Sequence, residues 1–477
     1  GGYQFDVLVP WIESLGIGFH LGVDGISATL VLLHAICAFC GVLISYAINE
    51  RIKEYYIFYL ILITGVFGVF TSLDLFFFYF FYEMAVIPMY PLIGIWGSDV
   101  KEAAIPRSRH SAAAPMAAAP QGVVRFTKEY AAMKLTIYLT LGAMVALLGL
   151  LWLYTSSGLR TFDLVVLERH FSALPLEASL QRWIFPLLAV GFGVIAPMWP
   201  FHSWSPIGHA AAPSAVSMLH AGVLMKLGSY AIIRLAVSLL PEGAAAWLPW
   251  MAGLWLFNIL YGGLVAMAQK DLKLIIGYSS SSHMGYVLLG IACFSPLALG
   301  GAVFLMFAHG IMTALAFALV GHVYDETHTR YLPELGGLAK RLPFIATCGV
   351  IAAMASSGLP GLANFVAELL VFLGSWDRYP LHTALAIFGV VITAIYMLRM
   401  IRGVFFGAAP ERLARVQDAR TVFARLPYLI LIAALLLVGC WPNPLARLFD
   451  VSARPLAERT MQAAQPRLVS ADAGEAE

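Results

Sequence analysis

The chain has 477 residues, of which 60% are hydrophobic and 12% are charged, and its formal net charge is +2. A soluble globule of this length needs more charged residues to cover its surface, so the composition predicts a membrane protein. The small, scattered charge also excludes a nucleic-acid-binding protein. The chain begins with Gly1 and shows no signal-peptide pattern, so we expect that the natural N-terminus lies upstream.

Apolar stretches long enough to cross a bilayer recur along nearly the whole chain. A helix needs about 20 apolar residues to span a hydrocarbon core of ~30 Å. The expected fold is all-α, a polytopic transmembrane helical bundle with about 12 spans. It forms a single domain over residues 25–445, with an N-terminal segment at 1–24 and a polar tail at 446–477. The spans are expected to begin near residues 25, 55, 74, 131, 183, 213, 246, 272, 298, 343, 383 and 424.

Basic residues concentrate in alternate connections between the predicted spans. Arg51, Arg125, Arg330 and Arg412 all fall in such loops, which the positive-inside rule places in the cytoplasm. The opposite loops hold few basic residues, and an even number of spans then predicts that both ends of the chain are extracytoplasmic. Lys270, Asp271 and Lys273 stand at a span boundary on the cytoplasmic side, where they are interpreted as topological anchors.

One cytoplasmic connection has a different composition from the rest. Residues 101–128, KEAAIPRSRHSAAAPMAAAPQGVVRFTK, are rich in Ala and Pro and carry no helical apolar face. This low-complexity segment is predicted to be a disordered loop, an insertion without a function of its own.

Two predicted spans are interrupted by proline and glycine. One break is PMWPFHSWSPIGHAAAP, residues 197–213, and the other is SSGLPGLANF, residues 356–365. Such breaks free backbone groups at bilayer depth, which only protein or water can satisfy, so they belong beside a lined cavity. Two discontinuous helices in the two halves of the chain suggest an internal repeat of the kind that secondary transporters show.

Three ionisable residues lie deep inside predicted spans. Glu83 is surrounded by aromatic residues, Lys226 is near the middle of its span, and Glu368 follows the second break. A charge at this depth is costly unless it is paired, hydrated or neutralised, so these residues predict a route for protons or cations. The alternative is a neutral, hydrogen-bonded structural role.

Several histidines could extend this route. His220 lies six residues before Lys226, and His202 and His209 flank the first break. His283 and His309 lie between Lys226 and Glu368 in sequence order, on separate spans. A single histidine is more often structural, but together these side chains could relay protons at mid-membrane depth.

No motif of the chain is typical of a flavin, iron-sulfur, nucleotide or metal site. Cys37 and Cys40 form a C-x-x-C pattern, but it lies in a membrane helix without flanking histidines. These cysteines are therefore interpreted as packing residues.

The motifs, taken in order, resemble those of the antiporter-like subunit M of proton-translocating NADH-quinone oxidoreductase, respiratory complex I. The resemblance extends from about residue 20 to 408. The matching segments are HLGVDGIS (20–27), FYEMAVIPMYPLIGIWG (81–97), KEYAAMK (128–134), AGVLMKLGSY (221–230), AQKDLKLIIGYSSSSHMGYVLLG (268–290), THTR (327–330), GGLAKRLP (336–343) and GLPGLANFVAE (358–368).

The resemblance implies a fold of about fourteen helices built on two inverted repeats, so about two helices would precede this chain. It assigns the family's helix-five glutamate to Glu83, its central lysine to Lys226 and its helix-twelve glutamate to Glu368. One position departs from the family, because Ile195 stands where the seventh helix usually has the lysine that pairs with the glutamate matching Glu83.

Two accounts of Ile195 remain open. Either His220, His209 or His202 takes over the role of the missing lysine, or the uptake half-channel is inactive and the subunit is partly structural. We favour the first account, because Lys226, His309 and Glu368 are all present and are costly to keep without a function.

The resemblance further implies a proton-translocating subunit of an enzyme complex in a bacterial-type plasma membrane. The relay of Glu83, Lys226, Glu368, His220, His283 and His309 would be coupled to quinone reduction in other subunits of the membrane arm. NADH, FMN, iron-sulfur clusters and quinone would be bound by partner subunits and not by this chain. The alternatives are a subunit of a multi-subunit cation/proton antiporter or of a membrane-bound hydrogenase, and a structural scaffold without transport.

Overall fold

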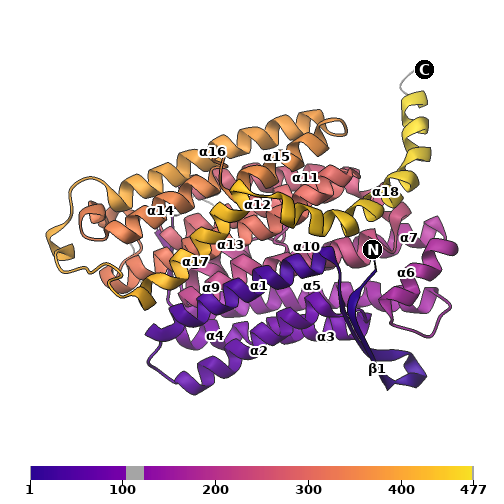
Figure 1. Cartoon of the computed structure of the whole chain (residues 1–477), viewed down its shortest axis with the longest axis horizontal. Helices are drawn as coiled ribbons and strands as arrows, with labels where there is room; N and C mark the ends of the chain where they lie inside the picture. Colours follow the sequence, from indigo (N-terminus) through magenta and orange to yellow (C-terminus); the bar gives the residue numbers. More distant parts are fainter. Residues whose placement is uncertain (1, 104–122, 475–477) are drawn as a thin grey trace, which may run out of the picture.

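The computed structural model describes residues 2–103 and 123–474, most of which form a bundle of helices aligned along the long axis of the molecule (Figure 1). The predicted all-α membrane fold is confirmed. The helices are α1 Gly25–Ile44, α2 Ile52–Thr71, α3 Leu75–Val86, α4 Met89–Trp96, α5 Lys128–Ser156, α6 Leu164–Ala173, α7 Ala178–Ile195, α8 Trp204–Ala211, α9 Ser214–Leu219, α10 Met225–Ala231, α11 Pro241–Ala268, α12 Leu272–Ala292, α13 Pro296–Thr327, α14 Pro343–Ser356, α15 Ala363–Trp376, α16 Pro380–Phe405, α17 Val422–Cys440 and α18 Asn443–Gly474.

Short helical segments join some of these helices. Two are π-helical, η3 His220–Leu224 and η4 Ile232–Val237, and they flank α10 to make one long span with α9. Five are 3₁₀ turns: η1 Glu13–Leu15, η2 Ser45–Ala47, η5 Leu332–Glu334, η6 Leu338–Lys340 and η7 Glu411–Leu413.

Two small antiparallel sheets were not predicted. β1 Gln4–Ile12 pairs with β2 Ile17–Val23 in a hairpin at one end of the bundle (Figure 1). β3 Val100–Ala103 pairs with β4 Val123–Phe126. The disorder predicted at these two flanks of the 101–128 loop is therefore wrong, because backbone hydrogen bonds join them across the loop. The rest of that prediction, for residues 104–122, lies outside the described residues.

Side-chain caps fix where several helices begin. The Asp24 carboxylate accepts hydrogen bonds from the backbone of Ile26 and Ser27 at the start of α1, and the Ser27 hydroxyl accepts one from Asp24 N in return. Asp74 and Asp271 cap α3 and α12 in a similar way. These side chains satisfy backbone donors that have no partner inside the first turn of a helix.

Ten helices of the described part are long and apolar enough to cross a membrane. The helix α12 is 21 residues long but carries a run of serines, and α14 and α15 are shorter apolar helices. Each predicted span start lies in or next to a helix, whereas the exact number of crossings stays a prediction. Which end of the bundle faces the cytoplasm also stays a prediction.

Both predicted helix breaks are present. The first separates α7, which ends at Ile195, from α8, which begins at Trp204. The second separates α14, which ends at Ser356, from α15, which begins at Ala363. Proline and glycine therefore interrupt the helices where their local backbone preferences predict it.

The centre of the bundle is formed by the span Ser214–Val237, α12 and α13. Nearly every residue of these three elements is buried by the surrounding helices. They nevertheless carry many of the buried polar side chains of the chain. The polar residues are thus enclosed by protein and kept away from the outer surface of the bundle.

The contact between α7 and α10 has no room for an additional methyl group at Gly228. A Cβ atom there would lie 2.4 Å from the Phe192 carbonyl oxygen and 2.5 Å from Cγ2 of Ile195. We expect Gly228→Ala to destabilise the chain by about 1–3 kcal/mol through overpacking, measured as a lower unfolding temperature in detergent. Gly94→Ala is the control, because no heavy atom lies within 4 Å of its added Cβ. Equal melting of both variants would contradict the tight contact.

Candidate functional site

Lys226 lies at the centre of the bundle and is fully buried. Its Nζ donates a hydrogen bond to the carbonyl oxygen of Ala221, at 2.5 Å, and lies 2.9 Å from Nδ1 of His309. Ala221 belongs to the π-helical segment η3, and such segments leave carbonyl groups without their usual helical partners. The irregular helix thus supplies an acceptor that holds the lysine against a histidine of α13.

His309 and His283 continue from Lys226 in a row. Their rings stack with centroids 5.0 Å apart and an interplanar angle of 23°. His309 Nε2 lies 3.0 Å from the Thr313 hydroxyl, and His283 Nδ1 lies 2.8 Å from the Ser279 carbonyl oxygen. His283 Nε2 also faces a carbonyl oxygen, that of Ser356 at 3.3 Å, and since a carbonyl oxygen only accepts, each contact calls for a proton on the ring nitrogen that makes it.

Glu368 ends the row at the second helix break. Its Oε1 lies 3.7 Å from Nε2 of His283, and both side chains are buried. A Cβ atom on Gly358 would lie 2.7 Å from Oε2 of Glu368, and Gly358 has a φ of +68°. Glycine at this turn therefore makes room for the carboxyl group and also adopts the left-handed backbone that the break requires.

The structure thus brings together four of the six predicted site residues, Lys226, His309, His283 and Glu368, which we call the central row. They come from four different spans, and each neighbouring pair is in contact. Sequence order alone could not show this alignment.

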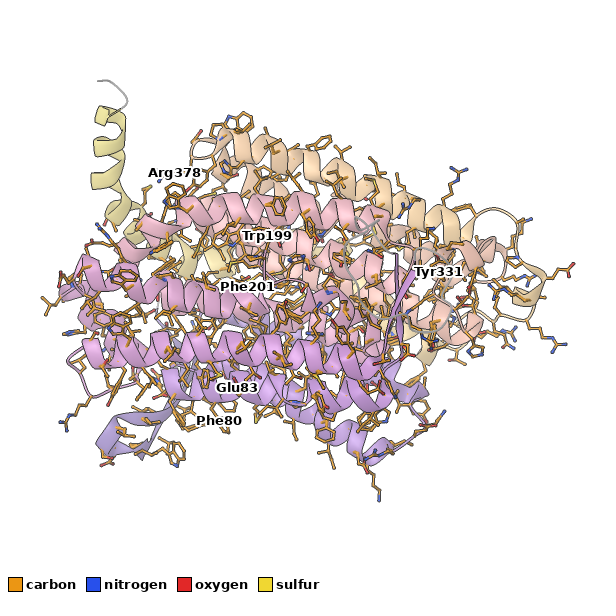
Figure 2. The ribbon with its side chains drawn as sticks, turned by 180° about the vertical axis from the view of Figure 1, so that it is seen from behind. Phe80, Glu83, Trp199, Phe201, Tyr331 and Arg378 are labelled. Carbon is orange, nitrogen blue, oxygen red and sulfur yellow. The ribbon has the colours of Figure 1, made fainter. Side chains whose placement is uncertain are left out.

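Glu83 lies apart from the central row. It is the ninth residue of α3, is half-buried, and hydrogen-bonds with Tyr79 one turn earlier. Figure 2 shows Glu83 close to Phe80, which is 48% exposed, and away from Trp199 and Phe201 of the first break. Its position near the surface of the isolated chain allows a neighbouring subunit to cover it.

His220 is the predicted site residue that lies beside the central row without joining it by a hydrogen bond. It is fully buried, and its ring is 4.2 Å from that of His209 and 5.3 Å from that of Trp204, centroid to centroid. Ile195 is also fully buried and faces Gly228 at the contact between α7 and α10. His202 packs against the ring of Tyr261.

Sequence reasoning missed a charged cluster at the end of the bundle that carries the basic loops. Arg330 pairs with Asp271, whose carboxylate oxygen lies 2.6 Å from Nε of the arginine, and it also donates to the carbonyl oxygens of Ala210 and Asp99. Lys273, which stands at the span boundary, is likewise buried. The acidic Asp271 in the AQKDLK segment and the basic Arg330 in the THTR segment have opposite charges, which could have indicated this contact.

A second ion pair lies at the opposite end. Arg234 pairs with Asp24, the cap of α1, and its guanidinium lies over the rings of Tyr3 and Tyr230. The Tyr3 hydroxyl donates to Glu168 of the short helix α6, and burial raises the pKa of the Glu168 carboxyl. This cluster ties the N-terminal segment to the bundle.

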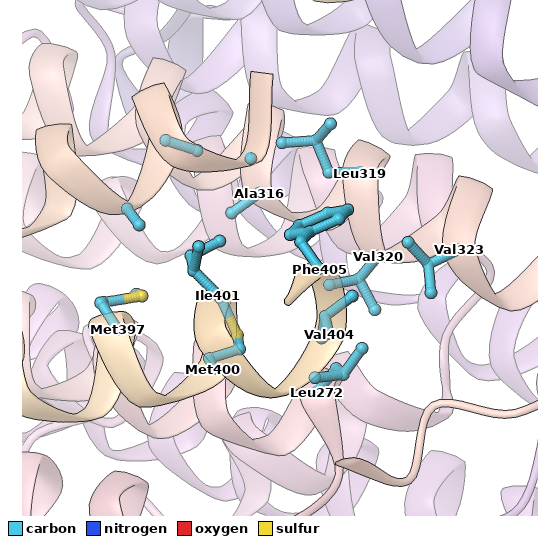
Figure 3. A pocket seen from close by; sticks show the side chains of 13 residues that line it. Leu272, Ala316, Leu319, Val320, Val323, Met397, Met400, Ile401, Val404 and Phe405 are labelled. Atoms are coloured by element: carbon cyan, nitrogen blue, oxygen red, sulfur yellow. The ribbon is translucent and has the colours of Figure 1, made fainter. Parts of the chain in front are cut away.

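An apolar pocket lies between α13, α14 and α16 and is separate from the central row (Figure 3). Its walls include Leu319, Met397, Met400 and Phe405, and its lining residues are all apolar. Within the described ranges, no group of three or more His, Cys, Asp or Glu side chains could hold a metal ion.

A buried row of ionisable side chains next to a broken helix, inside a multi-pass bundle, defines an antiporter-like membrane subunit. A family model described as "NADH:quinone oxidoreductase/Mrp antiporter, TM" matches residues 124–393. The chain belongs to this family.

Particular relatives refine the assignment. The chain is 37% identical to NADH-quinone oxidoreductase subunit M of Pseudomonas aeruginosa, covering 94% of this chain and 83% of the relative. It is 33% identical to the subunit M of Rickettsia prowazekii, covering 95% and 86%. A chain of respiratory complex I from Thermus thermophilus with bound NADH superposes with a TM-score of 0.84 at 29% identity, covering 97% and 90%. The predicted resemblance to subunit M is confirmed.

Proposed function

We propose that this chain is the proton-translocating membrane-arm subunit of an NADH-quinone oxidoreductase and that the central row carries the protons. The observation that carries this proposal is the unbroken contact from Lys226 through His309 and His283 to Glu368. Buried titratable groups in contact can pass a proton by changing protonation one after another. The relatives named subunit M support the same assignment.

Each group of the row has a defined part in the transfer. The Lys226 ammonium gives its proton to Nδ1 of His309 and becomes a neutral amine. A proton then passes from His309 to His283 through a water molecule, because the stacked rings of the two residues are not hydrogen-bonded to each other. It finally reaches the Glu368 carboxylate, which becomes a carboxylic acid and releases it. Each histidine and Glu368 return to their starting charge when they release the proton, and Lys226 returns to its own when the next proton arrives, so no net charge stays in the bundle. Glu83 is proposed to act at the edge of the chain, toward a neighbouring subunit.

The redox chemistry belongs to partner subunits in this proposal. NADH, FMN, iron-sulfur clusters and quinone would be bound there, and quinone reduction would drive the row through contacts between subunits. Residues 25–445 would form the membrane domain in a bacterial-type plasma membrane, with both ends of the chain extracytoplasmic. A subunit of a multi-subunit cation/proton antiporter and a subunit of a membrane-bound hydrogenase are the weaker alternatives, since the relatives named above are subunits of NADH-quinone oxidoreductase.

Glu368→Gln tests the last step of the transfer. Glutamine keeps the shape of the side chain but cannot take up and release a proton, so we expect a lower number of protons translocated per NADH oxidised in the reconstituted complex. Glu177→Gln, at an exposed position, is the matched control. If Glu368→Gln assembles normally and translocates as many protons as the unmodified complex, the row does not end at Glu368.

A further inference from the structure

A cavity of about 150 Å³ lies at the end of the bundle that carries the basic loops. It is lined by Lys273 and Asp325, and by residues 212–215 at the junction of α8 and α9. Asp325 is exposed, whereas Lys273 is only 3% exposed, so the cavity leads from the surface to a buried amine. A second cavity of about 250 Å³ shares Ser98 and Tyr324 with the first and extends it outward.

Polar contacts continue inward from this cavity. Nζ of Lys273 donates to the carbonyl oxygen of Ala212, at 2.6 Å. The Ser217 hydroxyl lies 3.2 Å from the same oxygen and 2.8 Å from the carbonyl oxygen of His209. The end of α8 therefore connects the buried amine to the helix turn that carries His209.

His209 and His220 pack against each other beside this junction, with ring centroids 4.2 Å apart. Nε2 of His209 is 2.9 Å from the Ser205 hydroxyl and 3.2 Å from Sδ of Met225, the residue before Lys226. Among the described residues, no hydrogen-bond partner is found for Nδ1 of His209 or for either ring nitrogen of His220. Both side chains are fully buried.

Packing alone does not account for His220. Burying polar nitrogens without partners is unfavourable, and a phenylalanine or leucine would fill the space beside Trp204 without that cost. An imidazole with both nitrogens unengaged is, however, able to accept a proton on one nitrogen and release one from the other. The arrangement thus favours a group that exchanges protons with a neighbour or with bound water.

We propose that His209 and His220 carry protons from the Lys273–Asp325 cavity to Lys226. A proton from the cavity forms an N–H bond on His209, and the transfer to His220 breaks that bond and leaves His209 neutral. His220 then protonates the neutral amine of Lys226, directly or through a water molecule, and regains its starting charge. This branch rests on the proposed function of the central row. It supplies protons to Lys226 in a chain whose residue 195 is an isoleucine, which cannot titrate.

The experiment compares variants of the assembled complex reconstituted in vesicles, with protons translocated per NADH as the readout. We expect His220→Phe to lower this yield to the level of Lys226→Ala, and the double variant to show no further loss, because the two groups act in series. His220→Asn, which keeps a hydrogen-bonding group but does not titrate, is expected to show the same loss.

His34→Phe is the matched control, because His34 is a fully buried membrane histidine outside this branch and is expected to keep the full yield. If Lys226→Ala lowers the yield but His220→Phe or His220→Asn leaves it unchanged, the proposed branch is wrong. If Lys226→Ala itself leaves the yield unchanged, the proposed function fails instead. If both His220 variants fail to assemble while His34→Phe assembles, His220 is a packing residue and the branch is wrong.

Discussion

Lys226→Ala is expected to abolish the proton translocation that this chain contributes while the rest of the complex still oxidises NADH. Alanine has no group that titrates, and its introduction removes the contact to Nδ1 of His309, so the central row loses its first donor. The measurement is the number of protons translocated per NADH by the complex reconstituted in vesicles.

Two further variants define what the lysine does. Lys226→Arg keeps a positive charge but cannot release a proton at any physiological pH, so we expect the same loss as with alanine. Lys340→Ala removes an exposed lysine and is expected to have no effect. Normal yield in Lys226→Ala, with normal assembly, would support the alternative of a scaffold without transport.

Arg330→Ala is expected to produce the largest loss of stability. The guanidinium holds the Asp271 carboxylate, which is only 2% exposed, and donates to the carbonyl oxygens of Ala210 and Asp99. Its removal leaves a buried carboxylate without its charged partner, which costs about 3–5 kcal/mol. We expect less of the chain in the membrane and a lower unfolding temperature of the purified complex.

The control for this effect is an exposed ion pair at the same end of the bundle. Arg412 lies 3.7 Å from Glu334, and their side chains are 52% and 40% exposed. Solvent screening limits such pairs to about 1 kcal/mol or less, so Arg412→Ala is expected to melt close to the unmodified chain. Similar losses in both arginine variants would mean that burial of the Asp271 pair does not decide stability.

The helices and their interruptions could be predicted because their signals are local. Apolar windows mark the spans, and proline and glycine mark the breaks after Ile195 and Ser356. Lys226 and Glu368 could be identified as candidates for the same reason, because an isolated charge inside an apolar window is recognised without any tertiary information. Glu83 also lies inside a helix, as the ninth residue of α3.

The contacts of the site could not be predicted in this way. His309 and His283 belong to different helices, and only the packing of α12 against α13 stacks their rings. The π-helical segment that presents Ala221 to Lys226 has no clear pattern in its sequence. Hydrophobic periodicity does not reveal such a local change of helix type, because all residues of the π-helical segment are buried.

The contacts of the cluster around Arg330 were not predicted for a related reason. The positive-inside rule assigns basic loop residues to an interface, but it does not say whether neighbouring loops cover them. Here the ends of α8 and α12 and the segment after α13 meet, so Arg330 and Lys273 are buried and paired with carboxylates or carbonyl oxygens. The β1–β2 hairpin was missed because its strands lie outside the apolar windows that predict the spans.

The measurement that tests the central row most directly is the proton yield of the double variant Lys226→Ala/Glu368→Gln. Since the two residues are joined through His309 and His283, they act in series, and either substitution alone should stop the transfer. We predict that the double variant and both single variants translocate the same lowered number of protons per NADH. A loss in the double variant that equals the sum of two separate losses would contradict a single row through this chain.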